Sequence, residues 1–174
     1  TDNRLKCDYH IKENEKTVVH ISNFRKVKRV TDVIYIFKEI AERIQAKLLL
    51  VGDGPDLSTV SHLVDELGLR DNVLFLGKQE NVAEILSLSD LLLLPSEKES
   101  FGLVLLEAMA CKVPVVATAV GGIPEVVVHR ETGFLSQVGD IENMARYAIR
   151  LLTDEALHKT FSENAYLRVH SHFH

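Results

Sequence analysis

Short apolar runs alternate with longer amphipathic stretches along this chain. The apolar runs cover residues 17–21, 47–51, 72–76, 90–94, 113–117 and 132–135. Runs that are apolar at nearly every position, without alternating polar residues, are typical of parallel strands buried on both faces of a sheet. We therefore expect a parallel sheet of six strands.

The stretches between these runs have the period of amphipathic helices. From residue 30 to 45, one stripe at helical spacing collects Val33, Ile34, Phe37, Ile40, Ala41 and Ile44. Further helices are expected over 57–67, with Gly68 as its terminating glycine, and over 82–88, 101–111, 141–153 and 155–169. The stretch 101–111 is apolar almost all round, which predicts a largely buried helix. Alternating strands and helices predict right-handed crossovers and a doubly wound, Rossmann-like α/β fold.

Composition limits what such a fold could do here. The 174 residues, 46% of them hydrophobic, are enough for one domain, which we expect to cover 1–174. The net charge of -5 disfavours a nucleic-acid partner. Two distant cysteines favour a reducing compartment, and no apolar run reaches the roughly 18 residues of a membrane span. We expect a cytoplasmic protein without a membrane span and, because its polar start lacks Met, a fragment of a longer chain.

Glycines gather where the predicted strands end. In doubly wound sheets, ligands bind outside the carboxyl ends of the strands. Six of the nine glycines fall at or just after predicted strand ends: Gly52, Gly54, Gly77, Gly102, Gly121 and Gly122. Turn chemistry explains any one of them, but their clustering indicates a ligand site. A dinucleotide fingerprint is incomplete because Leu57 replaces its third glycine, and no P-loop motif is present.

Four basic residues follow the first strand of this acidic chain. They are Arg25, Lys26, Lys28 and Arg29. One interpretation is a solvated helix entrance. The other is an anion site at the ligand edge, where the cations would offset the charge of a phosphate.

The segment 95–111 carries the most specific chemistry. Ser100 could cap a helix whose first residues, 101–104, would present free backbone N–H groups to a phosphate, worth about 1–2 kcal/mol from the helix end. Glu107 falls among apolar residues, so we expect it to be buried and to need hydrogen-bond donors. Sugar hydroxyls would satisfy it, as would a neighbouring backbone group or a lysine. Glu99, in the loop before the helix, could accept hydrogen bonds from the same ligand.

These residues resemble a known family. Glu99 and Glu107, separated by seven residues that include Ser-Phe-Gly, occur with GDGP at 52–55, FLG at 75–77, GGIPE at 121–125 and TGF at 132–134. Over essentially the whole chain, this combination resembles the C-terminal, nucleotide-sugar-binding domain of retaining glycosyltransferases with the GT-B fold. The resemblance implies a hexosyltransferase whose N-terminal acceptor domain is missing here, so that this fragment alone would be inactive.

The resemblance also implies roles for individual residues. Glu107 would hold the nucleotide ribose, and Glu99 would contact hydroxyls of the donor sugar. The diphosphate would lie against the helix start formed by Ser100, Phe101, Gly102, Leu103 and Val104. Lys28 matches the family's phosphate-binding lysine. Asn23 stands where the family has an arginine, which leaves Arg25 as the nearest substitute, and Gly77 and Lys78 would lie against the base. Glu99, Lys28 and Arg25 are thus the expected catalytic residues.

A narrower resemblance concerns the substrates. Residues 20–29, 48–55 and 76–79 resemble the family members that transfer N-acetylglucosamine from UDP-N-acetylglucosamine to L-malate in bacillithiol biosynthesis. This implies UDP-N-acetylglucosamine or UDP as ligand, malate bound through the missing domain, and it allows a homo-oligomer of the full-length enzyme. Because no Asp-x-Asp pair is present, we expect no metal, and no cofactor besides the UDP-sugar substrate. The alternatives are another acceptor, a GT-B-fold nucleotide-sugar epimerase, or a non-catalytic binding module.

Overall fold

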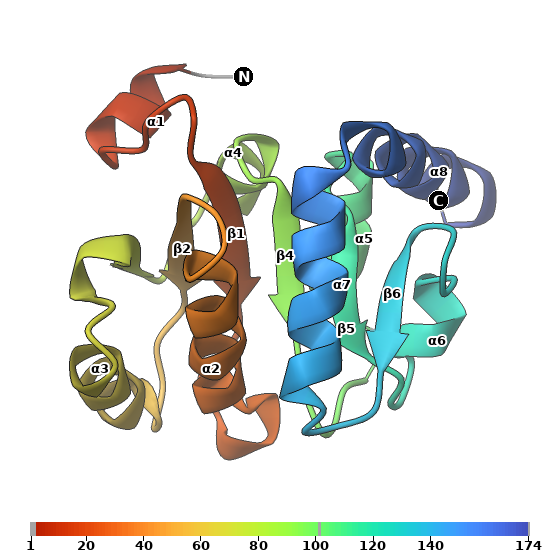
Figure 1. Ribbon diagram of the computed structural model, residues 1–174. Coiled ribbons are helices and arrows are strands. Elements are labelled where there is room, and N and C mark those ends of the chain that lie inside the picture. Colours follow the sequence, from red (N-terminus) through yellow and green to blue (C-terminus); the bar gives the residue numbers. More distant parts are fainter. Residues whose placement is uncertain (1–2, 101, 174) are drawn as a thin grey trace.

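A computed structural model describes residues 3–100 and 102–173 of the chain, and its centre is one parallel sheet (Figure 1). The strands lie in the order β3-β2-β1-β4-β5-β6. Their bounds are β1 Lys16–Ile21, β2 Ala46–Val51, β3 Val73–Gly77, β4 Leu91–Leu94, β5 Val115–Thr118 and β6 Gly133–Ser136. All five neighbouring pairs are parallel, which confirms the predicted six-stranded, doubly wound α/β sheet.

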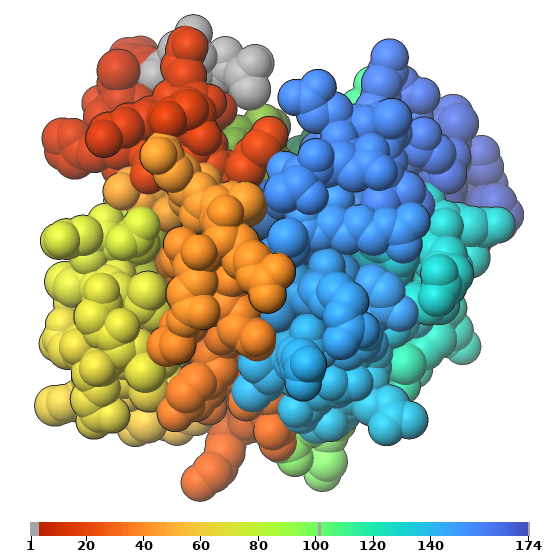
Figure 2. Space-filling view, in the orientation of Figure 1, coloured from red at the N-terminus to blue at the C-terminus, as the bar shows by residue number. Residues whose placement is uncertain are grey.

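Helices cover both faces of the sheet. In Figure 1, α2 (Val30–Ala41), α3 (Leu57–Glu66) and α7 (Ile141–Thr153) cover the near face, and Figure 2 shows α2 and α7 side by side there. The far face carries α4 (Val82–Ser87), α5 (Leu103–Ala110) and α6 (Ile123–Val126). The remaining helices, α1 (Asn3–Asp8) and α8 (Glu155–His172), lie near the amino ends of the strands.

The core consists of two apolar layers, one on each side of the sheet. Successive residues of a strand point to opposite faces, so Val18 belongs to one layer and Val19 to the other. The same division separates Leu48 and Leu50 from Leu49. Both layers exclude water, which is why the strands are apolar at consecutive positions and why the runs in the sequence do not alternate.

The helix and strand boundaries differ from the prediction in a few places. The first long helix ends at Ala41, four residues before the predicted end. Gly68 does terminate α3, with φ 69° and with the N–H of Leu69 donating to Val64 at 2.9 Å. The short helices α1 and α6 were not predicted, because six and four residues carry too little periodic pattern. Within the described residues, no helix is both long and apolar enough to cross a membrane.

Candidate functional site

The strand order reverses between β1 and β4. From β1 the chain proceeds to β2 on one side, whereas β4, β5 and β6 follow on the other. The loops after β1 and β4 therefore leave the sheet in a crevice at its carboxyl edge, the position where open α/β sheets bind ligands. This edge is at the bottom of Figure 1. We call residues 22–29 the β1 loop and residues 95–100 the β4 loop.

The two loops are joined directly. The N–H of Glu97 donates to the carbonyl of Val27 at 2.8 Å, and Arg29 Nη1 lies 3.5 Å from Glu97 Oε1. Between them, Lys28 Nζ contacts both oxygens of Glu99, at 2.7 Å and 3.0 Å. The structure therefore brings together two of the three predicted catalytic residues, although 71 positions separate them in the sequence.

Glu99 also lies beside the start of α5. Its Cγ is 3.9 Å from the position that a side chain would occupy at Gly102. Gly102 is the residue before α5 and has φ 72°, a left-handed conformation that glycine adopts without strain. The prediction that Ser100 caps this helix is wrong, because α5 begins at Leu103 and Gly102 occupies the cap position. Phe101, a predicted diphosphate contact, lies outside the described residues.

The start of α5 faces solvent. The first backbone N–H groups of a helix have no partner within it and carry the positive end of its dipole. Leu103 is 69% exposed, and Val104 is half-buried. An anion at this end would meet the amides of the first helical turn, with the Lys28–Glu99 pair beside it.

The exposure of Glu107 contradicts a second expectation from the sequence. This residue is exposed, not buried, so the predicted need for buried hydrogen-bond donors does not arise. On α5 the side chains of Leu105, Ala108 and Met109 are buried, whereas Leu103, Glu107 and Ala110 form an exposed stripe at helical spacing. The helix is therefore not buried all round. Glu107 stands one turn beyond the helix start, with its carboxylate open to a ligand.

Asn23 and Arg25 belong to the same loop as Lys28. Asn23 Oδ1 accepts a hydrogen bond from the N–H of Arg25 at 3.3 Å, which forms a local turn. The carbonyl of Arg25 in turn accepts from the N–H of Lys28 at 2.9 Å. Both Asn23 and Arg25 are exposed. Asn23 thus helps shape the loop and offers no charge, while the Arg25 side chain projects from it.

Gly77 and Lys78 lie farther along the same sheet edge, after β3. The Gly77 carbonyl accepts from the N–H of Gly52 at 2.8 Å, so this loop is fixed to the end of β2. Lys78 is exposed. In the described part of the chain, no hydrogen bond or ion pair joins these residues to Lys28 or Glu99, and β2 stands between the two loops in the sheet.

The four basic residues after β1 do not act as one cluster. Arg25 and Lys26 are exposed, and Lys28 pairs with Glu99. Arg29 forms ion pairs with Asp32, at 2.7 Å, and with Glu97. Its hydrogen bond to Asp32 raises the pKa of the Arg29 guanidinium, whereas burial acts to lower that pKa. Arg29 therefore holds the two loops together and is not free to bind a ligand.

His20 forms a buried network beneath the crevice that the sequence pattern did not predict. Its Nδ1 lies 2.8 Å from the Leu93 carbonyl, and its Nε2 lies 2.8 Å from Ser22 Oγ. The carbonyl can only accept, so neutral His20 donates through Nδ1 and accepts from the Ser22 hydroxyl. That hydroxyl accepts from the N–H of Phe24 at 3.2 Å. Burial lowers the pKa of His20 to about 4 against the opposing hydrogen bond to Leu93, and the charge of Lys28 adds to the lowering.

Gly121 fixes the backbone of the β4 loop. The N–H of Gly122 donates to the carbonyls of Glu99 and Ser100, at 3.4 Å and 3.1 Å. A methyl group added at Gly121 would overlap the backbone oxygen of Glu99 and lie 3.0 Å from its carbonyl carbon. The glycine is therefore required for one loop to approach another, whereas the sequence had suggested approach to a ligand.

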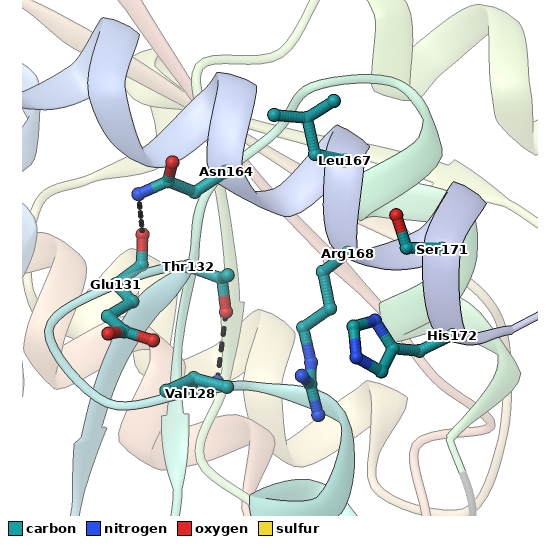
Figure 3. A pocket seen from close by; sticks show the side chains of 8 residues that line it. All are labelled: Val128, Glu131, Thr132, Asn164, Leu167, Arg168, Ser171 and His172. Carbon is teal, nitrogen blue, oxygen red and sulfur yellow. Dashed lines mark hydrogen bonds between the residues drawn. The ribbon is translucent and has the colours of Figure 1, made fainter.

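A surface groove of about 340 Å³ lies at the other end of the molecule (Figure 3). It is lined by residues of α8 and of the turn before β6, where Asn164 donates to the Glu131 carbonyl at 3.0 Å. Because these residues precede β6, the groove is near the amino ends of the strands, away from the crevice. None of the predicted site residues that the structure describes lines it.

Sequence comparison identifies the family. The pattern described as "Glycosyl transferases group 1" matches residues 2–168. The chain belongs to this family. Among curated relatives, N-acetyl-alpha-D-glucosaminyl L-malate synthase of Bacillus anthracis is 59% identical over 170 residues, which are 98% of this chain and 45% of that enzyme. D-inositol 3-phosphate glycosyltransferase of Mycolicibacterium smegmatis is 40% identical over 141 residues, 73% of this chain and 32% of that enzyme. The chain thus spans less than half the length of these relatives.

Solved structures of glycosyltransferases share the fold. Anabaena Alr3699/HepE in complex with UDP and glucose has a TM-score of 0.90 and 27% identity, over 97% of this chain and 47% of that one. Sucrose-phosphate synthase from Thermosynechococcus elongatus has a TM-score of 0.88 and 31% identity, over 98% of this chain and 44% of that one. The predicted membership of the GT-B glycosyltransferases is thereby confirmed.

Proposed function

We propose that this chain is the donor-binding domain of a retaining glycosyltransferase that transfers N-acetylglucosamine from UDP-N-acetylglucosamine to L-malate. The observation that carries the proposal is the Lys28–Glu99 pair at the switch point, beside the solvent-facing start of α5. A cation and a carboxylate thus lie beside a helix start at the ligand edge of the sheet, which supports binding of a nucleotide diphosphate and its sugar there. The 59% identity to the Bacillus anthracis synthase supports this donor and acceptor.

The residues would divide the donor between them. The diphosphate would lie against the amides of Leu103 and Val104, with Lys28 and Arg25 offsetting its charge. Exposed Glu107, one turn along α5, would accept hydrogen bonds from the ribose, and Glu99 would accept them from the sugar. Gly77 and Lys78 would contact the base. Malate would bind through the N-terminal domain of the intact enzyme.

The proposed reaction exchanges one bond at the anomeric carbon. The bond to the β-phosphate oxygen breaks, its electron pair leaves with UDP, and the malate hydroxyl oxygen bonds to the same face of the carbon. The hydroxyl proton moves to a phosphate oxygen of the departing UDP. The negative charge that develops on the diphosphate is stabilised by the preorganised amides of α5 and by Lys28.

The first prediction tests the donor site by calorimetry with UDP and UDP-N-acetylglucosamine. Lys28→Ala and Glu107→Ala should each weaken binding of the complete donor by about 10- to 100-fold, because each removes a charged hydrogen-bonding partner worth about 1.5–3 kcal/mol. Lys26→Ala, an exposed lysine of the same loop, and Glu163→Ala, an exposed glutamate of α8, are the matched controls. Unchanged binding in both site variants would refute the donor site.

We propose that the reaction requires neither a cofactor nor a metal ion. Because the cationic side chains and helix amides would supply the charge stabilisation, UDP affinity should change by less than about 2-fold when a chelator is added. Calorimetry with and without EDTA measures this directly. A UDP affinity that collapses with chelator and returns with Mg²⁺ would contradict it.

We also propose a reducing, cytoplasmic location for the protein, which its two free thiols, Cys7 and Cys111, support.

The acceptor is tested in the intact enzyme. UDP release is measured with L-malate and, for comparison, with D-inositol 3-phosphate, the acceptor implied by another relative's name. Release that depends on malate supports the proposed acceptor. Release with no acceptor, accompanied by conversion of the sugar to an epimer, would favour an epimerase instead.

A further inference from the structure

Lys28 and Glu99 form an ion pair with each other in this structure. The ammonium contacts both carboxylate oxygens, at 2.7 Å and 3.0 Å. In the proposed function the two groups serve different parts of the donor, the diphosphate and the sugar. Neither can bind its part of the donor fully while it is held by the other, so donor binding must exchange this ion pair for new contacts.

The pair is shielded enough for that exchange to matter. The side chain of Glu99 is 8% exposed and that of Lys28 is 18% exposed. Removing one partner from a shielded ion pair leaves the other charge without compensation, which costs more than separating two charges in open water. A ligand that takes Lys28 must therefore also provide something for Glu99, or bind against that cost.

The backbones on both sides of the pair are fixed. The Glu99 carbonyl accepts from the N–H of Gly122, and Gly121 packs directly against it. On the other side, the N–H of Lys28 donates to Arg25, and the Val27 carbonyl accepts from Glu97. The ion pair can therefore open by rotation of the two side chains, without displacement of either loop.

From this geometry we infer that the Lys28–Glu99 pair is a latch that makes the site favour the complete nucleotide sugar over the nucleoside diphosphate. The inference rests on the proposed function. A nucleotide sugar takes Lys28 with its diphosphate and supplies sugar hydroxyls as donors to Glu99, so both groups regain partners. The nucleoside diphosphate takes Lys28 but leaves Glu99 without a donor, and the latch competes with it. After transfer of the sugar, the same competition helps to release the product.

The test is calorimetry with UDP and with UDP-N-acetylglucosamine on the wild-type chain and on Glu99→Gln. The amide keeps the size of the side chain but no longer holds Lys28 by charge. UDP should bind about 3- to 10-fold tighter to the variant, the equivalent of about 0.6–1.4 kcal/mol. UDP-N-acetylglucosamine should not bind tighter, so the preference for the complete donor should fall. Glu99→Ala should shift UDP affinity in the same direction.

Glu97→Gln is the matched control. Glu97 belongs to the same loop and pairs with Arg29, but its side chain is 41% exposed, and among the described residues no hydrogen bond or ion pair joins its side chain to Lys28. Both affinities should stay within about 2-fold of wild type. If wild type binds UDP and Glu99→Gln leaves that affinity unchanged or weaker, the latch is refuted while the donor site stands. If wild type binds neither ligand, the proposed function fails and the latch fails with it.

Discussion

Gly121→Ala should destabilise the protein by about 2–5 kcal/mol and should weaken donor binding as well. Two costs combine. Gly121 has φ 53°, where a side chain adds about 1–2 kcal/mol of backbone strain. The new methyl group would also overlap the backbone oxygen of Glu99, and such overpacking typically costs about 1–3 kcal/mol.

Gly68→Ala separates these costs. Gly68 also has a positive φ, 69°, but nothing lies within 4 Å of the position its methyl group would occupy. Urea unfolding should therefore show about 1–2 kcal/mol of destabilisation for Gly68→Ala, from strain alone, and a larger loss for Gly121→Ala. Equal losses in the two variants would show that the contact with Glu99 has no energetic weight.

Binding provides the second measurement for the same pair of variants. Relief of the overlap requires the Glu99 carbonyl to move, and that movement shifts the carboxylate relative to Lys28 and the start of α5. We expect UDP-N-acetylglucosamine to bind Gly121→Ala about 10-fold more weakly under conditions where the variant is still folded, equivalent to about 1.4 kcal/mol. Gly68 lies at the end of α3, so Gly68→Ala should bind the donor like wild type.

The sheet was predictable from sequence, whereas the contacts that build the site were not. Consecutive apolar positions reveal parallel strands because both faces of the sheet are buried. The strand order and the pairing of Lys28 with Glu99 depend on how segments 71 positions apart pack together, and no local pattern encodes that. The rule that ligands bind at carboxyl strand ends points to one edge of the sheet but not to the side chains that meet there.

The errors at α5 have a local explanation. Glu107 was predicted to be buried because its immediate neighbours in sequence are apolar. In a helix, however, the residues that share a face are three or four positions away, and both Leu103 and Ala110 are exposed. The cap was assigned to Ser100 from side-chain chemistry, but the left-handed conformation of Gly102 ends the loop two residues later. The His20 network shows the same limit, since its acceptor on β4 is 73 positions away.

His20 should make the fold sensitive to acid in a defined range. Its pKa in the folded protein is about 4, lowered from 6.5 mainly by burial. In the unfolded chain, His20 takes up a proton as the pH falls through 6.5, whereas the folded protein resists this uptake until the pH approaches 4. Stability is therefore complete above pH 6.5 and is lost progressively down to pH 4, by about 3 kcal/mol for a shift of this size.

His20→Asn tests this prediction because its side-chain amide can still donate to the Leu93 carbonyl but cannot take up a proton. The variant should be less stable than wild type at pH 7.5 and should lose about 3 kcal/mol less between pH 6.5 and pH 4 in urea unfolding. His129, whose pKa is also lowered chiefly by burial, contributes to the slope that remains. His62→Asn, at an exposed histidine, is the control and should keep the wild-type slope. If His20→Asn also keeps the wild-type slope, then His20 takes up its proton in the folded protein over the same pH range as in the unfolded chain. A protonated His20 donates through Nε2 as well, so the donor direction assigned to the Ser22 hydroxyl would have to be reversed.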